Sequence, residues 1–238
     1  MLRILLLITV GLLLWNTVLA AENIKESKWK GEAELGLIYT SGNTKTDSVN
    51  LKAKIAKEQG KWRHLAAVAA LRTSDDTGTT AQRFELKGQS DYKFSEHEYL
   101  FGLVNYENDR FSGYDYRVSE AVGYGRRVLD QPDMTLNLEV GPGARQSKLD
   151  TGSSDSEFIM RGAAKYAWSI TKTSNFTEDL SVEAGKDTTI SKSVTALSSK
   201  INGDLAMRIS YTIRQASSVP PDIEKTDTET AVTLVYSY

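Results

Sequence analysis

The chain has 238 residues, of which 29 are basic and 31 acidic, giving a formal net charge of −2, and it contains no cysteine. A weakly acidic chain lacks the electrostatic footprint of a nucleic-acid-binding protein, so no DNA or RNA partner is expected. Without cysteine there is no disulfide framework, no thiolate metal site and no lipidated cysteine.

The first twenty residues differ from the rest of the chain. Arg3 precedes an apolar run over residues 4–14, which has the length of a secretory hydrophobic region and is too short to span a bilayer. Val18 and Ala20 are small enough for signal peptidase, which predicts cleavage after Ala20. We therefore expect a cleaved signal peptide (1–20), a short periplasmic segment (21–29) and one folded domain (30–238).

Alternation with a period of two dominates the mature chain. Between residues 83 and 94 every second side chain is charged or Gln, and the residues between them are apolar or small. The same split recurs over residues 158–168 and 205–214. This period is typical of strands with two unlike faces. No apolar run of 18 residues follows Ala21, so a membrane-spanning chain would have to cross with strands.

About twelve strands are predicted, each near or above the 9–11 residues that a tilted strand needs to cross a bilayer. They lie near 30–40, 45–58, 61–73, 82–94, 98–108, 114–128, 134–147, 157–170, 176–187, 190–201, 204–216 and 227–238. Tight turns alternate with connections that are on average longer and rich in Ser, Thr, Asp and Gly. We expect an all-β protein, a single antiparallel up-and-down transmembrane β-barrel in the outer membrane of a Gram-negative bacterium.

Two strands have an ambiguous register. Alanines blur the period over residues 61–73, and Glu120 falls on the otherwise apolar face of 114–128. The segment Gly141-Pro142-Gly143 predicts a bulge or bend in its strand.

In such a barrel the charged faces line the lumen. The residues proposed to line it are Arg83, Glu85, Lys87, Asp91, Arg161, Lys165, Arg208 and Arg214, together with Lys52, Lys54, Lys93, Glu32, Glu34 and Glu139. Because both signs are present and no long loop is available as a plug, we expect a closed or very narrow lumen. Trp62, Phe94, Tyr99, Trp168, Phe176 and Tyr238 are predicted to form an outward-facing aromatic girdle at the periplasmic end.

The C-terminus ends on an aromatic residue. Val232, Leu234, Tyr236 and Tyr238 share one face of the last strand. This pattern resembles the terminal strand by which the barrel-assembly machinery recognises its substrates, so that machinery and outer-membrane lipid are the expected partners.

Several segments carry a family resemblance. Residues 34–44 (ELGLIYTSGNT), 202–206 (NGDLA), 219–221 (VPP) and the close from Lys225 to Tyr238 resemble the salt-induced outer-membrane protein family, over essentially the whole mature chain. The resemblance implies an outer-membrane barrel connected with salt stress. It carries over no catalytic or ligand residues.

No recognisable reaction centre is present in the sequence. His64 and His97 are the only histidines, and neither has a serine and an acid at a known catalytic spacing. Acidic residues cluster in the expected outer loops (Asp75, Asp76, Asp109, Asp115, Asp150 and Asp155) without the spacing of a calcium loop. We expect no catalytic residues, cofactor or metal site. We expect the barrel to be a narrow, restricted pore or a structural or stress-related protein of the outer membrane. Two alternatives stay open: a barrel enzyme acting on lipid or peptide, and a soluble periplasmic β-barrel that binds an apolar ligand.

Overall fold

A computed structural model describes residues 29–40 and 46–238 of the chain, which form twelve antiparallel strands. The strands are β1 (Trp29–Thr40), β2 (Thr46–Gln59), β3 (Trp62–Asp75), β4 (Gly78–Lys93), β5 (Glu98–Asp109), β6 (Tyr114–Asp130), β7 (Met134–Leu149), β8 (Ser154–Ser169), β9 (Ser174–Gly185), β10 (Thr189–Asn202), β11 (Leu205–Ala216) and β12 (Thr226–Ser237). The expected signal peptide, most of the segment 21–29 and the turn 41–44 lie outside the described residues.

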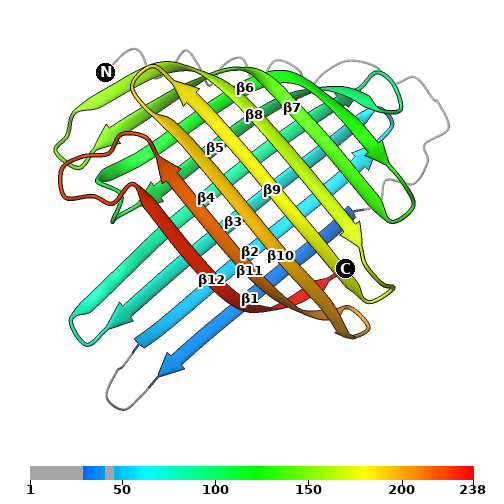
Figure 1. The fold of residues 1–238 in the computed structure, drawn as a ribbon, viewed down its shortest axis with the longest axis horizontal. Coiled ribbons are helices and arrows are strands. Elements are labelled where there is room, and N and C mark those ends of the chain that lie inside the picture. Colours follow the sequence, from blue (N-terminus) through cyan, green and yellow to red (C-terminus); the bar gives the residue numbers. More distant parts are fainter. Residues whose placement is uncertain (1–28, 41–45) are drawn as a thin grey trace.

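Each strand pairs with its sequence neighbours, and β1 pairs with β12, so the sheet closes into a barrel with strongly tilted strands (Figure 1). The predicted fold class is confirmed. The β1–β12 register runs only from Glu32–Ser237 to Leu35–Leu234, and Figure 1 shows the two strands diverging beyond it. We call this joint the seam.

The connections fall into two sets. At the turn end, where the C-terminus also lies, strands are joined by residues 60–61, 94–97, 131–133, 170–173 and 203–204. At the loop end, the described connections are 76–77, 110–113, 150–153, 186–188 and 217–225. Two expected loops, 74–81 and 148–156, are largely strand, because β3, β4, β7 and β8 continue into them. Alternation fails there because both faces of these hairpin ends are polar.

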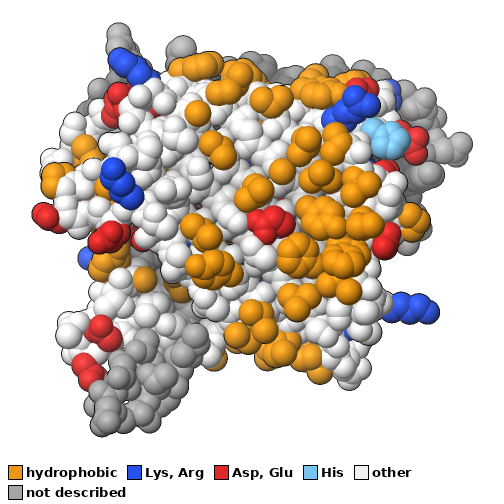
Figure 2. Space-filling view, in the orientation of Figure 1, with side chains coloured by type: hydrophobic (Ala, Val, Ile, Leu, Met, Phe, Trp, Pro, Cys, Tyr) orange, Lys and Arg blue, Asp and Glu red, His pale blue; other side chains and the backbone are white. Residues whose placement is uncertain are grey.

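The two faces of the wall carry opposite chemistry. Large apolar side chains such as Leu86, Val122 and Met160 are exposed on the outside, at 50%, 62% and 52%. Figure 2 shows hydrophobic side chains over the outer face, with an acidic group among them and Lys and Arg near the margins. Arg145 and Glu139, in contrast, are buried inside. Within the described ranges no helix is long and apolar enough to cross a membrane.

Glu120 and Glu178 are exceptions to the apolar outer face. Glu120 pairs in register with Val104 and Ala144, which places it on the outside, and this settles the register of β6. Glu178 also faces outward, where its carboxylate accepts hydrogen bonds from Ser193 Oγ at 2.7 Å and from Thr195.

The aromatic girdle was predicted with one error. Trp62, Phe94, Trp168 and Tyr238 are exposed on the outside at the turn end, but Tyr99 is only 4% exposed. Tyr99 points into the lumen, where it packs with Phe101, Leu103 and Ala121. Residues 99–104 are apolar on both faces, so alternation could not choose between them.

Glycines let β6 and β7 approach one another closely. A Cβ atom at Gly141 would overlap the carbonyl of Val122, and one at Gly143 would overlap that of Glu120. The register continues from Ala121–Gly143 to Tyr124–Val140 without a shift. The sequence predicted a bulge or a bend at 141–143, and the unshifted register shows that the bulge is wrong. The glycines permit close strand contact.

Candidate functional site

Ion pairs cross the centre of the barrel. Glu85 of β4 accepts hydrogen bonds from Lys192 Nζ of β10 at 2.6 Å and from Arg214 Nη2 of β11 at 2.7 Å. In the ring of twelve strands β4 and β10 stand directly opposite each other. The Glu85–Lys192 pair therefore spans the lumen, and we call it with Arg214 the central bridge.

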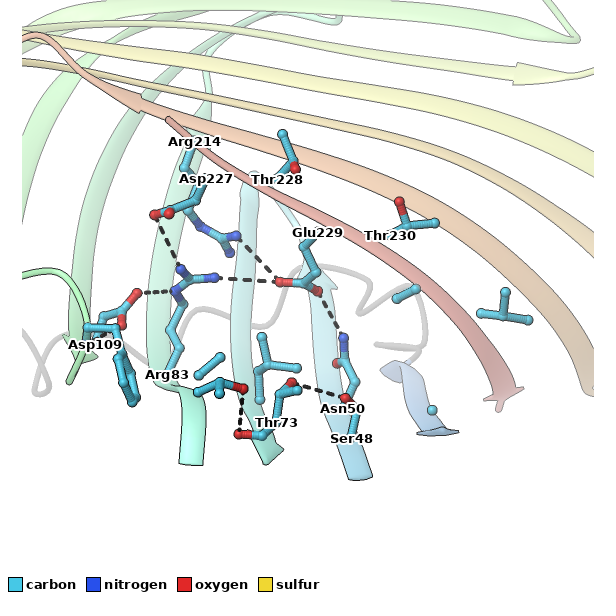
Figure 3. A pocket seen from close by; sticks show the side chains of 17 residues that line it. Ser48, Asn50, Thr73, Arg83, Asp109, Arg214, Asp227, Thr228, Glu229 and Thr230 are labelled. Atoms are coloured by element: carbon cyan, nitrogen blue, oxygen red, sulfur yellow. Dashed lines mark hydrogen bonds and ion pairs between the residues drawn. The ribbon is translucent and has the colours of Figure 1, made fainter. Parts of the chain in front are cut away.

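The loop side of the central bridge holds a second set of ion pairs, seen in Figure 3. Arg83 lies 2.6 Å from Asp109, 3.5 Å from Glu229 and 3.8 Å from Asp227. Glu229 also lies 3.5 Å from Arg214, which connects this set to the central bridge. These residues line a hollow of about 340 Å³ that we call the vestibule.

On the turn side of the bridge, Glu139 is the centre of a buried cluster. Its carboxylate accepts hydrogen bonds from Lys165 at 2.7 Å, Gln89 at 2.9 Å, Tyr99 at 3.1 Å and Arg161 at 3.2 Å. The Glu139 side chain has no exposed surface. These donors come from β4, β5 and β8, so the cluster joins the strands along one arc of the wall from β4 to β8.

Between the central bridge and the Glu139 cluster lies a cavity of about 370 Å³, which we call the inner cavity. Charged side chains of both signs line it, among them Lys54, Lys87 and Asp179. Its wall also includes apolar residues such as Leu65 and Leu103. The lumen is thus a series of hollows separated by ion pairs.

The loop 217–225 covers part of the mouth. Its base is fixed to the first residue of β10 by a hydrogen bond from Ser217 N to Thr189 O at 2.9 Å. Its tip reaches the β5–β6 turn, where a Cβ atom at Gly113 would lie 3.0 Å from Pro220 and 3.3 Å from Ile223. Since β6 stands opposite β12 in the ring, the loop crosses the opening. Val219, Pro220 and Ile223 are half-buried there, so the loop lies over the mouth, while the absence of a separate plug inside the lumen stays a prediction.

The structure places all eight proposed lumen residues on the inner face. Their positions are Arg83, Glu85, Lys87 and Asp91 on β4, Arg161 and Lys165 on β8, and Arg208 and Arg214 on β11. The central bridge joins Glu85 to Arg214, and the Glu139 cluster joins Arg161 to Lys165. Asp91 instead pairs with Arg63 at 2.6 Å.

Sequence reasoning missed Lys192, Arg145 and Glu229. Lys192 lies on β10, whose outer face carries Ser191, Ser193 and Thr195, so no apolar period marks either face. Arg145, 1% exposed, pairs with Glu157 at 2.6 Å and with Glu183 at 3.5 Å. Glu157 is the register partner of Arg145 on the neighbouring strand β8. The contacts of Lys192 with Glu85 and of Glu229 with Arg83, in contrast, join strands that only the closed barrel brings together.

The histidines form ordinary local contacts. His64 stacks on Trp62 outside the barrel and lies 2.8 Å from Ser90 Oγ. His97 lies 3.5 Å from Asp130 at the turn end. Within the ranges described, no three His, Asp or Glu side chains are grouped as metal ligands would be.

The terminal aromatic closes the barrel. Tyr238 and Gly31 exchange two backbone hydrogen bonds of 3.0 Å. The Tyr238 ring covers Gly31, where a Cβ atom would overlap it, and lies 6.4 Å from the Tyr236 ring. The apolar side chains at 232, 234, 236 and 238 are all exposed on the outer face.

A solved outer-membrane porin has a similar architecture. The NanC porin aligns over 88% of this chain and 98% of its own, with a TM-score of 0.53 and 10% identity. An outer membrane channel from Pseudomonas putida F1 aligns over 88% and 94%, with a TM-score of 0.49 and 10% identity. At such low identity the likeness concerns the fold alone.

Sequence comparison identifies relatives of unknown role. The uncharacterised protein YdiY of Escherichia coli (strain K12) is 29% identical over 214 residues, which cover 88% of this chain and 83% of YdiY. The family model described as "Protein of unknown function, DUF481" matches residues 33–238. The match supports an uncharacterised family, and it does not extend to the salt-induced name. The chain belongs to the DUF481 family.

Proposed function

We propose that this protein is an outer-membrane channel for small polar solutes whose lumen is held narrow by the central bridge. The observation that carries the proposal is the pair between Glu85 and Lys192, which joins opposite walls at 2.6 Å. Hollows of about 340 and 370 Å³ lie on either side of it.

Conduction in planar bilayers tests the proposal. The wild-type protein should give small stepwise currents, because the bridge and the loop 217–225 restrict the path. Glu85→Gln removes the charge that holds Lys192 and Arg214 across the lumen, and the steps should become several-fold larger.

Glu58→Gln is the matched control. Glu58 pairs with Lys93 at 2.7 Å near the turn end, and its side chain is 58% exposed, so its loss should leave the steps unchanged. Well-folded Glu85→Gln protein with steps no larger than those of the wild type would refute the central bridge as the constriction. The absence of steps from both proteins would refute the channel and favour a purely structural barrel.

Export to the outer membrane completes the proposal. The apolar outer face and the aromatic rings near the turn end support insertion into a bilayer. Mature protein should begin at Ala21 by mass spectrometry and stay with outer membranes after carbonate washing. Release by carbonate would favour the soluble barrel instead.

The proposal has two further parts. The first is a role in salt stress, and the second is recognition of the chain by the barrel-assembly machinery. The first rests on the family resemblance of the sequence. A several-fold rise in protein level after addition of NaCl would support it, and a level that does not change would refute it. The second rests on the outward apolar face of β12 and is tested below with Tyr238.

A further inference from the structure

We propose that the inner cavity is a binding site for a small organic anion with an apolar body. The inference rests on the proposed function, since it names the class of solute that the channel would accept. The inner cavity has a volume of about 370 Å³, which falls within the range of small-molecule sites.

Two ammonium groups supply the anion site. The register aligns Lys54 with Ala67 and Ala67 with Lys87, so the two lysines flank one small residue on neighbouring strands. Both side chains line the inner cavity. Among the described residues neither makes an ion pair or a side-chain hydrogen bond, in contrast to Lys165 and Lys192 on other parts of the wall.

The carboxylates of the cavity are mostly engaged already. Glu32 and Glu34 pair with Arg208, Glu85 belongs to the central bridge, and Glu183 lies 3.5 Å from Arg145. Asp179 on β9 is the exception, since it has no ion pair within the part of the barrel that the structure describes.

Two free ammonium groups therefore face one free carboxylate. This balance favours a solute with a single negative charge. The carboxylate of Asp179 would repel a second negative charge, so a dianion is disfavoured.

The apolar part of the wall supplies the other half of the site. Leu65, Ala67 and Ala69 of β3, with Leu103 of β5 and Val194 of β10, line the same cavity. Inward positions of an aqueous pore are ordinarily polar. An apolar surface beside two ammonium groups matches a ligand with one charged end and an apolar body.

Calorimetric titration of the refolded protein in neutral detergent micelles tests the site, with micelles alone as the blank. Benzenesulfonate, which stays ionised, should bind saturably at one site. Methanesulfonate should bind at least about tenfold more weakly because it lacks the apolar body, and phenethylammonium should not bind. The substitutions Lys54→Gln and Lys87→Gln should each lower the affinity for benzenesulfonate by about tenfold, which corresponds to about 1.4 kcal/mol of binding free energy.

Lys93→Gln is the control, because Lys93 lies at the turn end in an ion pair with Glu58. Equal binding to the Lys54→Gln/Lys87→Gln double variant, or phenethylammonium binding as tightly as benzenesulfonate, would overturn the inference. Binding is measured without conduction, so a failed titration and a failed bilayer experiment are separate results.

Discussion

Glu139→Gln should destabilise the barrel strongly. In the native protein this fully buried carboxylate accepts hydrogen bonds from Lys165, Arg161, Gln89 and Tyr99. The amide keeps the shape but removes the negative charge, which leaves two cations without compensation inside the lumen. Breaking a buried ion pair in this way costs about 3–5 kcal/mol.

The expected change in a denaturation experiment follows from this cost. The free energy of unfolding falls by about 1–3 kcal/mol for each molar of urea. A variant whose free energy of unfolding is lower by about 3 kcal/mol should therefore unfold at a urea concentration about 1–3 M lower. Tryptophan fluorescence of protein refolded into lipid vesicles would report the transition, since Trp62 and Trp168 lie on the outer face. The control Glu58→Gln breaks a solvent-exposed pair and should cost no more than about 1 kcal/mol. Equal midpoints for Glu139→Gln and wild type would show that the cluster does not hold the lumen together.

Three further outcomes can be measured. Gly141→Ala should lower the free energy of unfolding by about 1–3 kcal/mol in the same urea assay, because its Cβ meets the β6 backbone. Gly162→Ala has open space around its Cβ and should change the free energy of unfolding by no more than about 0.5 kcal/mol, so equal effects of the two substitutions would contradict the close strand contact. Tyr238→Ala keeps both backbone hydrogen bonds of the terminal residue, so stability after refolding should be near normal. It removes the terminal aromatic side chain, so we expect low outer-membrane levels in cells, and normal cellular levels would refute the assembly signal. Replacing residues 217–225 with a short glycine-rich turn should speed maleimide labelling of Glu229→Cys, whose side-chain position is 16% exposed in the native protein, and unchanged labelling would show that the loop does not cover the vestibule.

The strands could be predicted from the sequence because the two faces of the wall meet different solvents. Along β4 this produces an unbroken alternation, and the predicted and observed strands agree closely. Where both faces share one chemistry the pattern is lost. Residues 99–104 are apolar on both faces, so the pattern placed Tyr99 on the wrong face. Polar and apolar residues are mixed on both faces of β10, so the pattern did not reveal Lys192.

The pairing inside the lumen could not be predicted in the same way. Alternation says which side chains point inward but not which of them meet. Glu85 contacts a residue 107 positions away, and Glu34 contacts Arg208 over 174 positions. Such contacts depend on strand tilt and stagger, which belong to the closed barrel as a whole. The crossing of the mouth by 217–225 depends on the same geometry.

The seam makes local stability uneven around the wall. β1 pairs with β2 along its whole length to Thr40–Thr46, but its register with β12 ends at Leu35–Leu234. Beyond that point the loop-end half of β12 is paired on the β11 side, and side chains of Asn50 and Glu229 join β2 to β12 through one hydrogen bond of 2.9 Å. Separation there breaks no hairpin and few backbone hydrogen bonds, so it is the lowest-energy way to open the ring. The vestibule adjoins the seam, because Gly36 of β1 and Val232 of β12 both line it. Backbone amide hydrogens should accordingly exchange faster along the β1-facing edge of β12 than in β6 or β7.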